Sequence, residues 1–563
     1  MTEAIYSLRP LLAVLVSAIA IPLIVASYRR PNVREGWSVA AALAKFGIIA
    51  SMLPAVLAGE EFRWSFGAYV PGIEFALRAD ALGMLFALLA SFLWVFTAFY
   101  AAGYMRGLDE HSQTRFFAAF AGSLSAAVGI AFAENLLTIF VFYELLSVAT
   151  YPLVAHNEDE EARIAGRKYL AYTFFGGGVL VLGGTVLVFA LVGTTTFGDT
   201  AAGLATADPT LARAAFAMLA AGFGVKAALM PAHSWLPDAM VAPTPVSGLL
   251  HAVAVVKSGV FGIARVVLDV FGPELVTDLG VGVLLAALAA FTLTVASIIA
   301  LRQDRLKARL AYSTISQLSY IILGLGVLGP TAIKGALLHI PAHAFMKLTL
   351  FFCAGIIHVE THTDYISEMD GIGKRMPLTM TAFAVAAAGM AGIPLIAGFV
   401  SKWFLLIGSV QTGQAVFAVV LLVSGVLNIA YFWPIVYGAF FESADTADEK
   451  PLVGGPFGGR TPVPDGGTQS GESPVDHSAE TNYAVDRNPS DHHSEDPHEE
   501  HDAHHGGPGP DGWQRAGWTG AEGSWLMLGP ILAIAAGSVV LGIVPYEAVF
   551  LELIELIVAG VSA

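Results

Sequence analysis

Apolar stretches of about 20 residues recur along almost the whole chain and alternate with shorter polar connections. A membrane-spanning helix needs about 20 predominantly apolar residues, and about fourteen stretches reach that length. The pattern therefore predicts an all-α polytopic membrane protein. The stretch 377–408 is longer than one straight span requires, so we expect it to be broken or strongly tilted. The predicted spans are 8–27, 37–58, 78–101, 116–133, 136–155, 169–192, 212–230, 246–268, 279–301, 310–329, 331–357, 377–408, 413–441 and 524–545.

Arginine and lysine residues collect in alternate connections between the predicted spans. Cytoplasmic loops of membrane proteins carry an excess of these residues. The bias therefore predicts a multi-pass protein of the cell membrane, with its N-terminus outside and the segment 442–523 in the cytoplasm. A cleavable signal peptide has the opposite charge polarity to the first span, so we expect a retained helix there. The connections assigned to the cytoplasm hold Arg29, Arg30, Arg34, Arg106, Arg115, Arg163, Arg167, Lys168, Arg302, Arg305, Lys307, Arg309, Lys374 and Arg375.

Composition separates one polar segment from the rest of the chain. The 563 residues are 56% hydrophobic and 13% charged, against about 25% charged in a soluble domain, so most of the surface is expected to face lipid. Much of the formal net charge of -16 comes from 442–523, which is predicted to be a disordered loop. Its histidines could bind a transition metal or buffer protons, but their spacing matches no structural zinc site. They are His477, His492, His493, His498, His501, His504 and His505.

Proline and glycine interrupt two spans in related ways. The segments 222–247 and 389–403 each place a lysine, Lys226 or Lys402, within about two turns of a proline. Corresponding broken helices in two halves of a transporter are typical of inverted repeats around a midplane site. The predicted organisation is three N-terminal spans in 1–115, two inverted five-helix repeats in 116–268 and 279–441, the polar loop 442–523, and a last span with a C-terminal tail in 524–563.

Five lysines and one glutamate stand out inside the predicted spans. A charge at mid-bilayer costs roughly 2.5–3.5 kcal/mol even on the lenient insertion scale, so the set could cost on the order of 15 kcal/mol. Such groups are retained where ions or protons must cross, which makes a transport protein the first hypothesis. Lys334 lies near a helix start and could snorkel, and Lys45 and Arg265, near span ends, are expected to do so. The six are Glu144, Lys226, Lys257, Lys334, Lys347 and Lys402.

Two constellations favour proton transfer. His339, His343 and Lys347 are spaced four apart and project from one helix face, which favours a proton wire because histidine titrates near neutrality. The alternative is a set of polar groups satisfied by neighbouring helices. Glu144 is expected to pair with Lys226, and the alternative there is a static buried ion pair, which is usually a poor stabiliser. Lys257 lies six residues after a histidine, so a relay between those two needs water or another helix.

No cofactor motif is present in the sequence. The single Cys353 lies in an apolar span and forms no CxxC site. The stretch 324–329 matches GxGxxG, but it lies inside a span and not between a strand and a helix, so it is no nucleotide site. Nothing favours nucleic acid. We therefore expect no cofactor, leave any metal site unassigned, and expect protons, Na+ or K+, membrane lipid and other hydrophobic subunits as partners.

Four segments together carry a family resemblance. HSWLPDAMVAPTPVSGLLHAVAVVK (233–257), DRLKARLAYSTISQLSYIILGLG (304–326), HIPAHAFMKLTLFFCAG (339–355) and AGIPLIAGFVSKWFL (391–405) occur in this order. They resemble the antiporter-like subunits shared by Mrp-type cation/proton antiporters and respiratory complex I, over about residues 75–441. The run GFVSKWFLL, with the preceding MDGIGKRMPLT, is most similar to the Mrp D-type subunit, whereas the insert 442–523 departs from both patterns.

The resemblance implies a fourteen-helix fold of two inverted repeats with a central polar axis. It implies Glu144 and Lys226 as an input pair, Lys257 and the stripe His339–His343–Lys347 as a connecting relay, and Lys402 as an exit-side residue. The family's residue at the Lys402 position is sometimes glutamate.

Three functions stay open at this point. The first hypothesis is a proton-translocating subunit of a multi-subunit Na+ (or K+)/proton antiporter. The rival is a proton-pumping membrane subunit of an NADH-quinone oxidoreductase or hydrogenase-type complex, in which all redox chemistry belongs to partner subunits. A third is a membrane partner in inorganic-carbon uptake. Neighbouring reading frames distinguish the three.

Overall fold

The structure is a computed structural model that describes residues 4–443, 522–545 and 549–562. Within these ranges, eleven helices or helix runs are long and apolar enough to cross a membrane. The predicted helical, polytopic membrane fold is confirmed, but the number of spans is not. The eleven are α1 (Arg9–Ala26), α2 (Pro31–Ala50) with α3 (Leu53–Leu57), α4 (Ala81–Gly107), α5 (Gln113–Phe132), α6 (Leu136–Val154), α7 (Glu160–Phe174) through η1 (Phe175–Val181) to α8 (Leu182–Val192), α15 (Val281–Leu301), α16 (Leu306–Val327), α17 (Pro330–Thr361), α20 (Ala415–Phe441) and α21 (Trp525–Ile543).

The remaining apolar stretches form shorter or interrupted helices. The stretch 377–408 is broken, as predicted, into α18 (Pro377–Ala391) and α19 (Ala397–Gln411). The stretch 212–230 forms α10 (Pro209–Lys226), and 246–268 forms α12 (Thr244–Gly248), η3 (Leu249–Val253), α13 (Val255–Arg265) and η4 (Val266–Val270). The other short helices are α9 (Ala201–Thr206), α11 (Trp235–Asp238), η2 (Ala239–Val241), α14 (Pro273–Asp278), η5 (Ile366–Glu368), η6 (Ile372–Lys374) and α22 (Phe550–Ser562).

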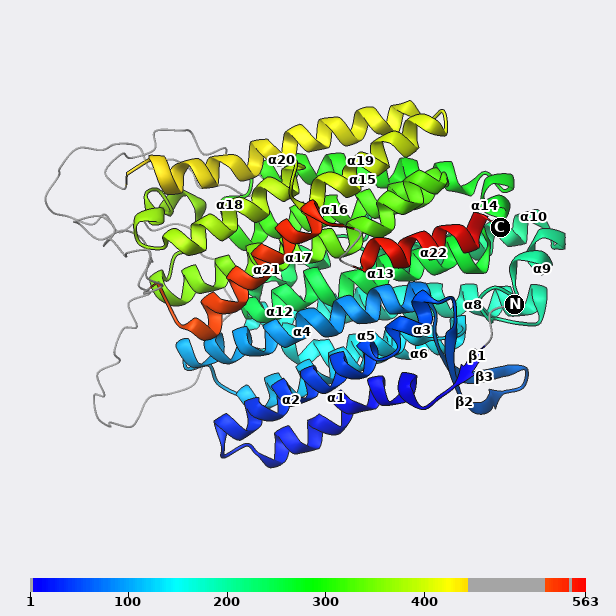
Figure 1. The fold of residues 1–563 in the computed structure, drawn as a ribbon, viewed down its shortest axis with the longest axis horizontal. Coiled ribbons are helices and arrows are strands. Elements are labelled where there is room, and N and C mark those ends of the chain that lie inside the picture. Colours follow the sequence, from blue (N-terminus) through cyan, green and yellow to red (C-terminus); the bar gives the residue numbers. More distant parts are fainter. Residues whose placement is uncertain (1–3, 444–521, 546–548, 563) are drawn as a thin grey trace, which may run out of the picture.

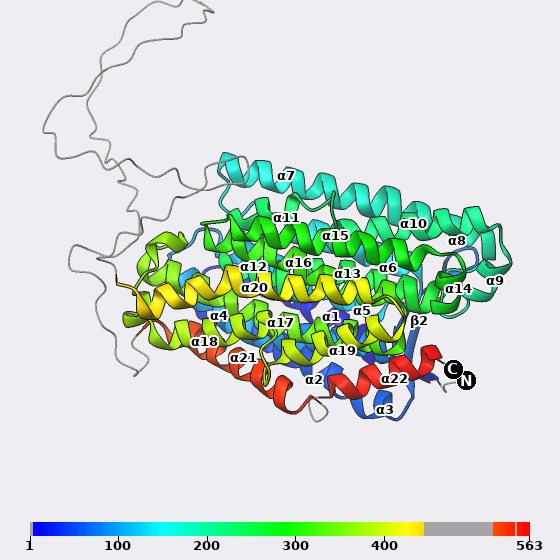
Figure 2. The ribbon, with the colours of Figure 1, turned by 90° about the horizontal axis from the view of Figure 1, so that it is seen from above.

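The long helices lie side by side along the long axis of the molecule (Figure 1). Both chain termini lie at one end of this bundle, and the last residues of α20 and the first of α21 lie at the other. Figure 2 shows α7, α8 and α10 along one edge of the molecule and α21 and α22 along the opposite edge. Between them, α17 is buried along its whole apolar window and α16 along nearly all of its own. These two helices therefore form the centre on which the polar side chains converge.

The burial pattern of the outer helices is the reverse of that in a soluble protein. On α20, Val416, Leu422 and Val426 are exposed, whereas Ser424 and Asn428 are buried. A helix in lipid exposes its apolar side chains and turns its polar groups towards other helices. The α20 pattern thus places lipid on the outer face and hydrogen-bonding partners inside.

A small β-sheet at the terminal end of the bundle was not predicted. It contains β1 (Ala4–Tyr6), β2 (Glu61–Val70) and β3 (Ile73–Ala79). β1 pairs with β2 in parallel, and β2 pairs with β3 in antiparallel fashion. Strands of this length alternate side chains with period two, which a search for spans of about 20 apolar residues does not detect. The all-α class is confirmed, and this small sheet is a local addition in one connection.

Lys45 and Arg265 are buried, which contradicts the expectation that they snorkel. The Lys45 side chain is fully buried, and its amine donates to the Leu124 carbonyl at 3.1 Å. Arg265 is 1% exposed and donates to both Asp80 oxygens, at 2.6 and 2.7 Å, and to Asp269 at 2.8 Å. A carbonyl or carboxylates inside the protein take the place of headgroups and water, so neither side chain needs to reach the membrane surface.

The predicted domain limits stay predictions. The polar segment 442–523 lies almost entirely outside the described residues, so its predicted disorder and cytoplasmic position are untested. The inverted relation between 116–268 and 279–441 also stays a prediction. What the structure does show is one broken element in each of these segments, at Lys226 and between Gly392 and Ile396.

Candidate functional site

Glu144 and Lys226 lie near each other, on α6 and at the end of α10. The Lys226 amine is fully buried, donates to the carbonyl of Tyr143 and sits 3.4 Å from the centre of the Tyr143 ring. Within the described residues the Glu144 carboxylate makes no ion pair with this amine, and its Oε1 is buried without a hydrogen-bond partner. The two charges are still close enough to attract each other. Glu144 and Lys226 therefore interact as neighbouring charges and not through a direct salt bridge.

The Glu144 carboxylate lies against a stretch of π-helix. A Cβ atom added to Gly177, in η1, would lie only 1.6 Å from Glu144 Oε1. Glycine is therefore required there for the carboxylate to occupy this position. π-Turns inside α-helices are rare and are frequent at functional sites. Three consecutive glycines at 176–178 are the sequence signal that could have revealed this feature.

The first helix break places Lys226 at the negative end of α10. The helix ends at Lys226, and the indole Nε1 of Trp235 donates to the carbonyl of Val225 at 2.9 Å. Backbone carbonyls freed at a break inside a membrane need protein or water as partners. Trp235 supplies one partner, and a lysine in the last turn interacts favourably with the helix dipole.

Lys402 lies beside the second helix break. Its amine reaches from α19 back to the end of α18 and donates to the carbonyl of Met390. Gly392, at φ +91, ends α18 in the left-handed conformation, and a Cβ there would come within 3.2 Å of Lys402 Cδ. The ring of Tyr320 lies 4.9 Å from the amine. The end of α18 thus presents a carbonyl to a half-buried amine, whereas the Lys226 amine at the end of α10 donates to a carbonyl of α6.

Lys257 contacts the α17 stripe directly. Its fully buried amine lies 2.9 Å from His343 Nδ1 and donates to the Ile340 carbonyl at 3.1 Å. This contact joins α13 to α17. From the sequence, a relay between His251 and Lys257 needs water or another helix, and α17 is a helix that contacts both residues.

The three members of the stripe have different partners. His339 lies 2.8 Å from Ser401 Oγ and 2.9 Å from Gln317 Oε1. Lys347 donates to Ser313 Oγ at 2.5 Å and to the Leu310 carbonyl. Neighbouring helices therefore satisfy these two residues, as the alternative interpretation stated. His343 differs, because its Nε2 is buried without a hydrogen-bond partner, and its ring centre lies 6.1 Å from that of His339.

A line of polar side chains on α16 extends the site and was missed in the sequence. Ser313, Gln317 and Tyr320 recur at helical spacing and face Lys347, His339 and Lys402 respectively. Gln317 also donates to Asn428 of α20 at 3.0 Å. The polar run STISQLSY inside an apolar span was the available signal.

Two further buried polar residues, Ser247 and His251, were not assigned a role. Among the described residues, neither the Ser247 hydroxyl nor either ring nitrogen of His251 has a hydrogen-bond partner. His251 packs against Phe351, with ring centres 4.7 Å apart, and lies close enough to Lys347 and His343 for charges to interact. Buried polar atoms left unpaired are uncommon and often mark an unseen water.

Lys334 is separate from this axis. Its amine forms an ion pair with Glu555 of α22 at 2.6 Å and lies 5.1 Å from the Phe404 ring. A carboxylate near the C-terminus thus compensates its charge.

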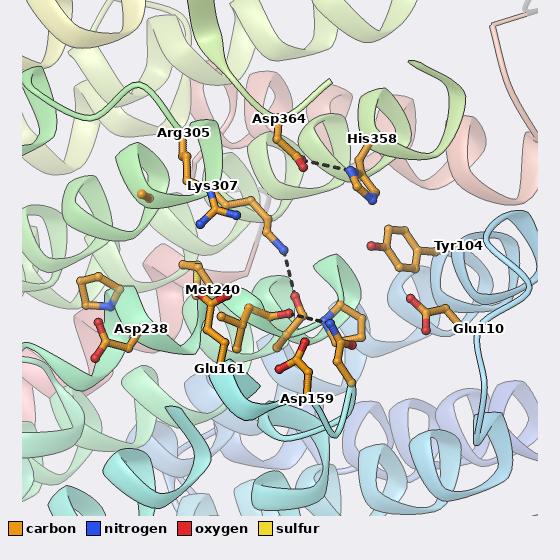
Figure 3. Close-up of a pocket in the computed structure, with 16 residues that line it drawn as sticks. Tyr104, Glu110, Asp159, Glu161, Asp238, Met240, Arg305, Lys307, His358 and Asp364 are labelled. Carbon is orange, nitrogen blue, oxygen red and sulfur yellow. Dashed lines mark hydrogen bonds and ion pairs between the residues drawn. The ribbon is translucent and has the colours of Figure 1, made fainter. Parts of the chain in front are cut away.

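A polar pocket of about 380 Å³ opens beside the start of α12 (Figure 3). It lies among connections that the charge pattern assigns to the cytoplasm. Lys307 donates to the Ala242 carbonyl at 2.9 Å, and His358 lies 3.0 Å from Asp364. The carboxylates that line it are Glu110, Asp159, Glu161, Asp238 and Asp364.

Comparison with known proteins places this arrangement in a family. The model of the transmembrane family "NADH:quinone oxidoreductase/Mrp antiporter" matches residues 133–428, the segment that contains all of the predicted site residues. The chain belongs to this family. NADH-quinone oxidoreductase subunit N of Desulforudis audaxviator (strain MP104C) is 35% identical over 438 residues, which cover 75% of this chain and 86% of that protein.

Antiporter subunits are also similar to this chain. The A/B subunit of a probable K(+)/H(+) antiporter of Rhizobium meliloti (strain 1021) is 34% identical over 415 residues, or 71% of this chain, although the match spans only 40% of that relative. A chain of the Mrp complex from Dietzia sp. DQ12-45-1b has the same fold, with a TM-score of 0.77, 20% identity and coverage of 99% and 98%. A chain of an archaeal membrane-bound sulfane sulfur reductase reaches a TM-score of 0.70 at 25% identity, covering 77% of this chain and 88% of that one.

Gly177 and Gly178 offer a matched test of the Glu144 site. Gly177→Ala forces the carboxylate to move, because the new Cβ would overlap Oε1, whereas nothing lies within 4 Å of a Cβ at Gly178. Both changes alter backbone entropy by the same amount, about 0.5–1 kcal/mol. We expect cation-driven proton flux in everted vesicles to fall about tenfold or more in Gly177→Ala and to stay at the parent rate in Gly178→Ala. Equal rates in the two variants would mean that transport does not depend on the position of the Glu144 carboxylate.

Proposed function

We propose that this family member is a proton-translocating membrane subunit of a multi-subunit antiporter that exchanges Na+ or K+ for protons across the cell membrane. The observation that carries the proposal is the buried contact between Lys257 and His343. It joins α13, which packs at Gly259 against the backbone of Lys226 and Ala227, to the α17 stripe. From the stripe, His339 contacts Ser401 on α19, the helix that holds Lys402. Other hydrophobic subunits of the complex are the partners that the relatives' complexes suggest.

The proposed mechanism is transfer of charge along this axis. Among the described residues, Lys257, Lys347 and Lys402 have no carboxylate in ion-pair contact, so dipoles and aromatic ring faces compensate these three positive charges. Charges in such surroundings interact over longer distances than in water, and Lys257 and Lys347 are close enough to repel each other. A proton gained at Glu144 removes the attraction that holds charge at Lys226, and the change is passed to Lys257 and onward.

Ser247 and His251 mark the proposed path from the cytoplasmic side to this axis. The pocket is lined by Met240, Val241, Ala242 and Pro243, which directly precede α12. Ser247 and His251 follow at about one turn and two turns, and their unpaired atoms suit bridging waters. The five pocket carboxylates would concentrate cations at its mouth. Protons would then pass through waters at Ser247 and His251 to His343 and Lys257.

A redox-driven complex is the second candidate. The similarity to subunit N, over most of both chains, favours it. In that case the same axis pumps protons, and electron transfer in partner subunits supplies the energy. Identification of the proteins that copurify with the chain distinguishes the two: small hydrophobic subunits support the antiporter, and iron–sulfur subunits support the redox complex.

Replacement of the input pair tests the site assignment. Glu144→Gln and Lys226→Ala each remove a charge from the start of the axis, so we expect cation-driven proton flux to fall about tenfold or more. The measurement uses everted vesicles from an antiporter-deficient host that expresses the whole complex. Lys374→Ala, which removes an exposed lysine in the connection before α18, serves as the control and keeps the parent rate. Unchanged flux in both test variants would reject the assignment.

The proposed entry path makes a separate prediction. His251→Phe and Ser247→Val remove the atoms that would hold water while keeping side chains of similar size, so proton delivery to Lys257 should slow about tenfold. His362→Asn changes an exposed histidine whose positive φ asparagine tolerates, and it should leave the rate unchanged. The readout is the initial rate of vesicle acidification or alkalinisation after a cation pulse. Parent rates in both His251→Phe and Ser247→Val would mean that protons enter elsewhere.

A further inference from the structure

Glu110, His111 and His156 form a cluster outside the proton axis. Glu110 and His111 lie in the connection between α4 and α5, and His156 lies just after α6. Glu110 Oε2 lies 3.7 Å from His111 Nδ1 and 3.7 Å from His156 Nε2. The three potential ligand atoms all lie within 4.8 Å of one another. These separations are too long for hydrogen bonds.

The surroundings of the His156 side chain give independent support for a ligand at this cluster. This side chain is fully buried, and neither ring nitrogen has a hydrogen-bond partner in the part of the chain that the structure describes. The rings of Phe116 and His111 pack around it, with centres 5.6 and 4.8 Å away. A buried polar group that is left unpaired costs roughly 1–3 kcal/mol, so a ligand at Nε2 would remove a real penalty.

The donor set suits a particular class of ion. Two imidazoles and one carboxylate are ligands of zinc and similar divalent transition metals, and three protein ligands leave one position open for water. Zn–N distances of about 2.0–2.1 Å in tetrahedral geometry place ligand atoms about 3.3 Å apart, close to the 3.7 Å separations found here. Glu110 also lines the polar pocket, which gives the ion an entry route and space for water (Figure 3).

We propose that Glu110, His111 and His156 bind one divalent transition-metal ion, with Zn2+ as the representative, at the end of the molecule where the polar pocket opens. Binding would tie the connection after α4 to the connection after α6, the helix that carries Glu144. The two histidines lie outside the proton axis, whereas Glu110 is also one of the five carboxylates of the pocket at the proposed entry path. Zn2+ binding is measured without transport, so the two proposals are tested separately.

The test must exclude metal binding by the seven histidines of 442–523. The parent protein for the experiment is therefore the full chain, purified in detergent, with those seven histidines replaced by glutamine. Zn2+ bound per chain is measured by elemental analysis after dialysis, and affinity by calorimetric titration. We expect one tightly bound Zn2+ per parent chain and a thermal unfolding midpoint that rises with Zn2+.

Single substitutions then assign the ion to the cluster. Glu110→Gln and His111→Gln remove half-buried or exposed ligands with little risk to folding, and each should weaken Zn2+ binding about 100-fold or more. His156→Gln should do the same. His362→Asn, at an exposed histidine outside the cluster, should retain the parent affinity. Parent-like affinity in Glu110→Gln and His111→Gln, or no tight Zn2+ in a parent that unfolds cooperatively, would overturn the proposal.

Discussion

The buried contact between Lys257 and His343 is the interaction on which the site depends. It brings an amine and an imidazole together at the centre of the bundle, where water is scarce and an uncompensated charge is costly. Carbonyl oxygens, hydroxyls and ring faces surround the amines of the axis, and the described residues place no carboxylate in ion-pair contact with Lys257, Lys347 or Lys402. Such dipoles lower the cost of a positive charge without fixing it at one residue. The arrangement suits a charge that must move.

Breaks in helical geometry place these groups. A carbonyl at the end of a broken helix has no partner inside that helix and can accept from a lysine. Termination of α18 before Gly392 leaves the Met390 carbonyl for Lys402, whereas Lys226, at the end of α10, donates to Tyr143 of the continuous helix α6. The π-turn η3 changes the phase of the helix between His251 and Lys257, so residues six apart both approach α17. Local departures from regular structure are therefore what join the two halves of the polar axis.

Much of this could be predicted from the sequence, and the reasons are physical. The length of an apolar stretch predicts a span, and prolines and glycines mark the breaks. A spacing of four places His339, His343 and Lys347 on one helix face. All three signals are local in the sequence. The π-turns, the Gly177–Glu144 approach and the contact of Lys257 with α17 depend on packing between distant segments, which periodicity does not encode. Arg265 shows the same limit: its position near a span end suggested snorkelling, but Asp80, 185 residues earlier, neutralises it inside the protein. The cluster at Glu110 and His156 was missed because its members are far apart in the sequence and ordinary when taken singly.

The central claim is that charge crosses the protein through Lys257, and one comparison tests it directly. Lys45 and Lys257 are both fully buried lysines that donate to a backbone carbonyl at 3.1 Å, but only Lys257 contacts the polar axis. Cation-driven proton flux is measured in everted vesicles for Lys257→Met and Lys45→Met at matched levels of assembled complex. The account predicts a loss of about tenfold or more for Lys257→Met and a parent-like rate for Lys45→Met. Parent-like flux in Lys257→Met would contradict it.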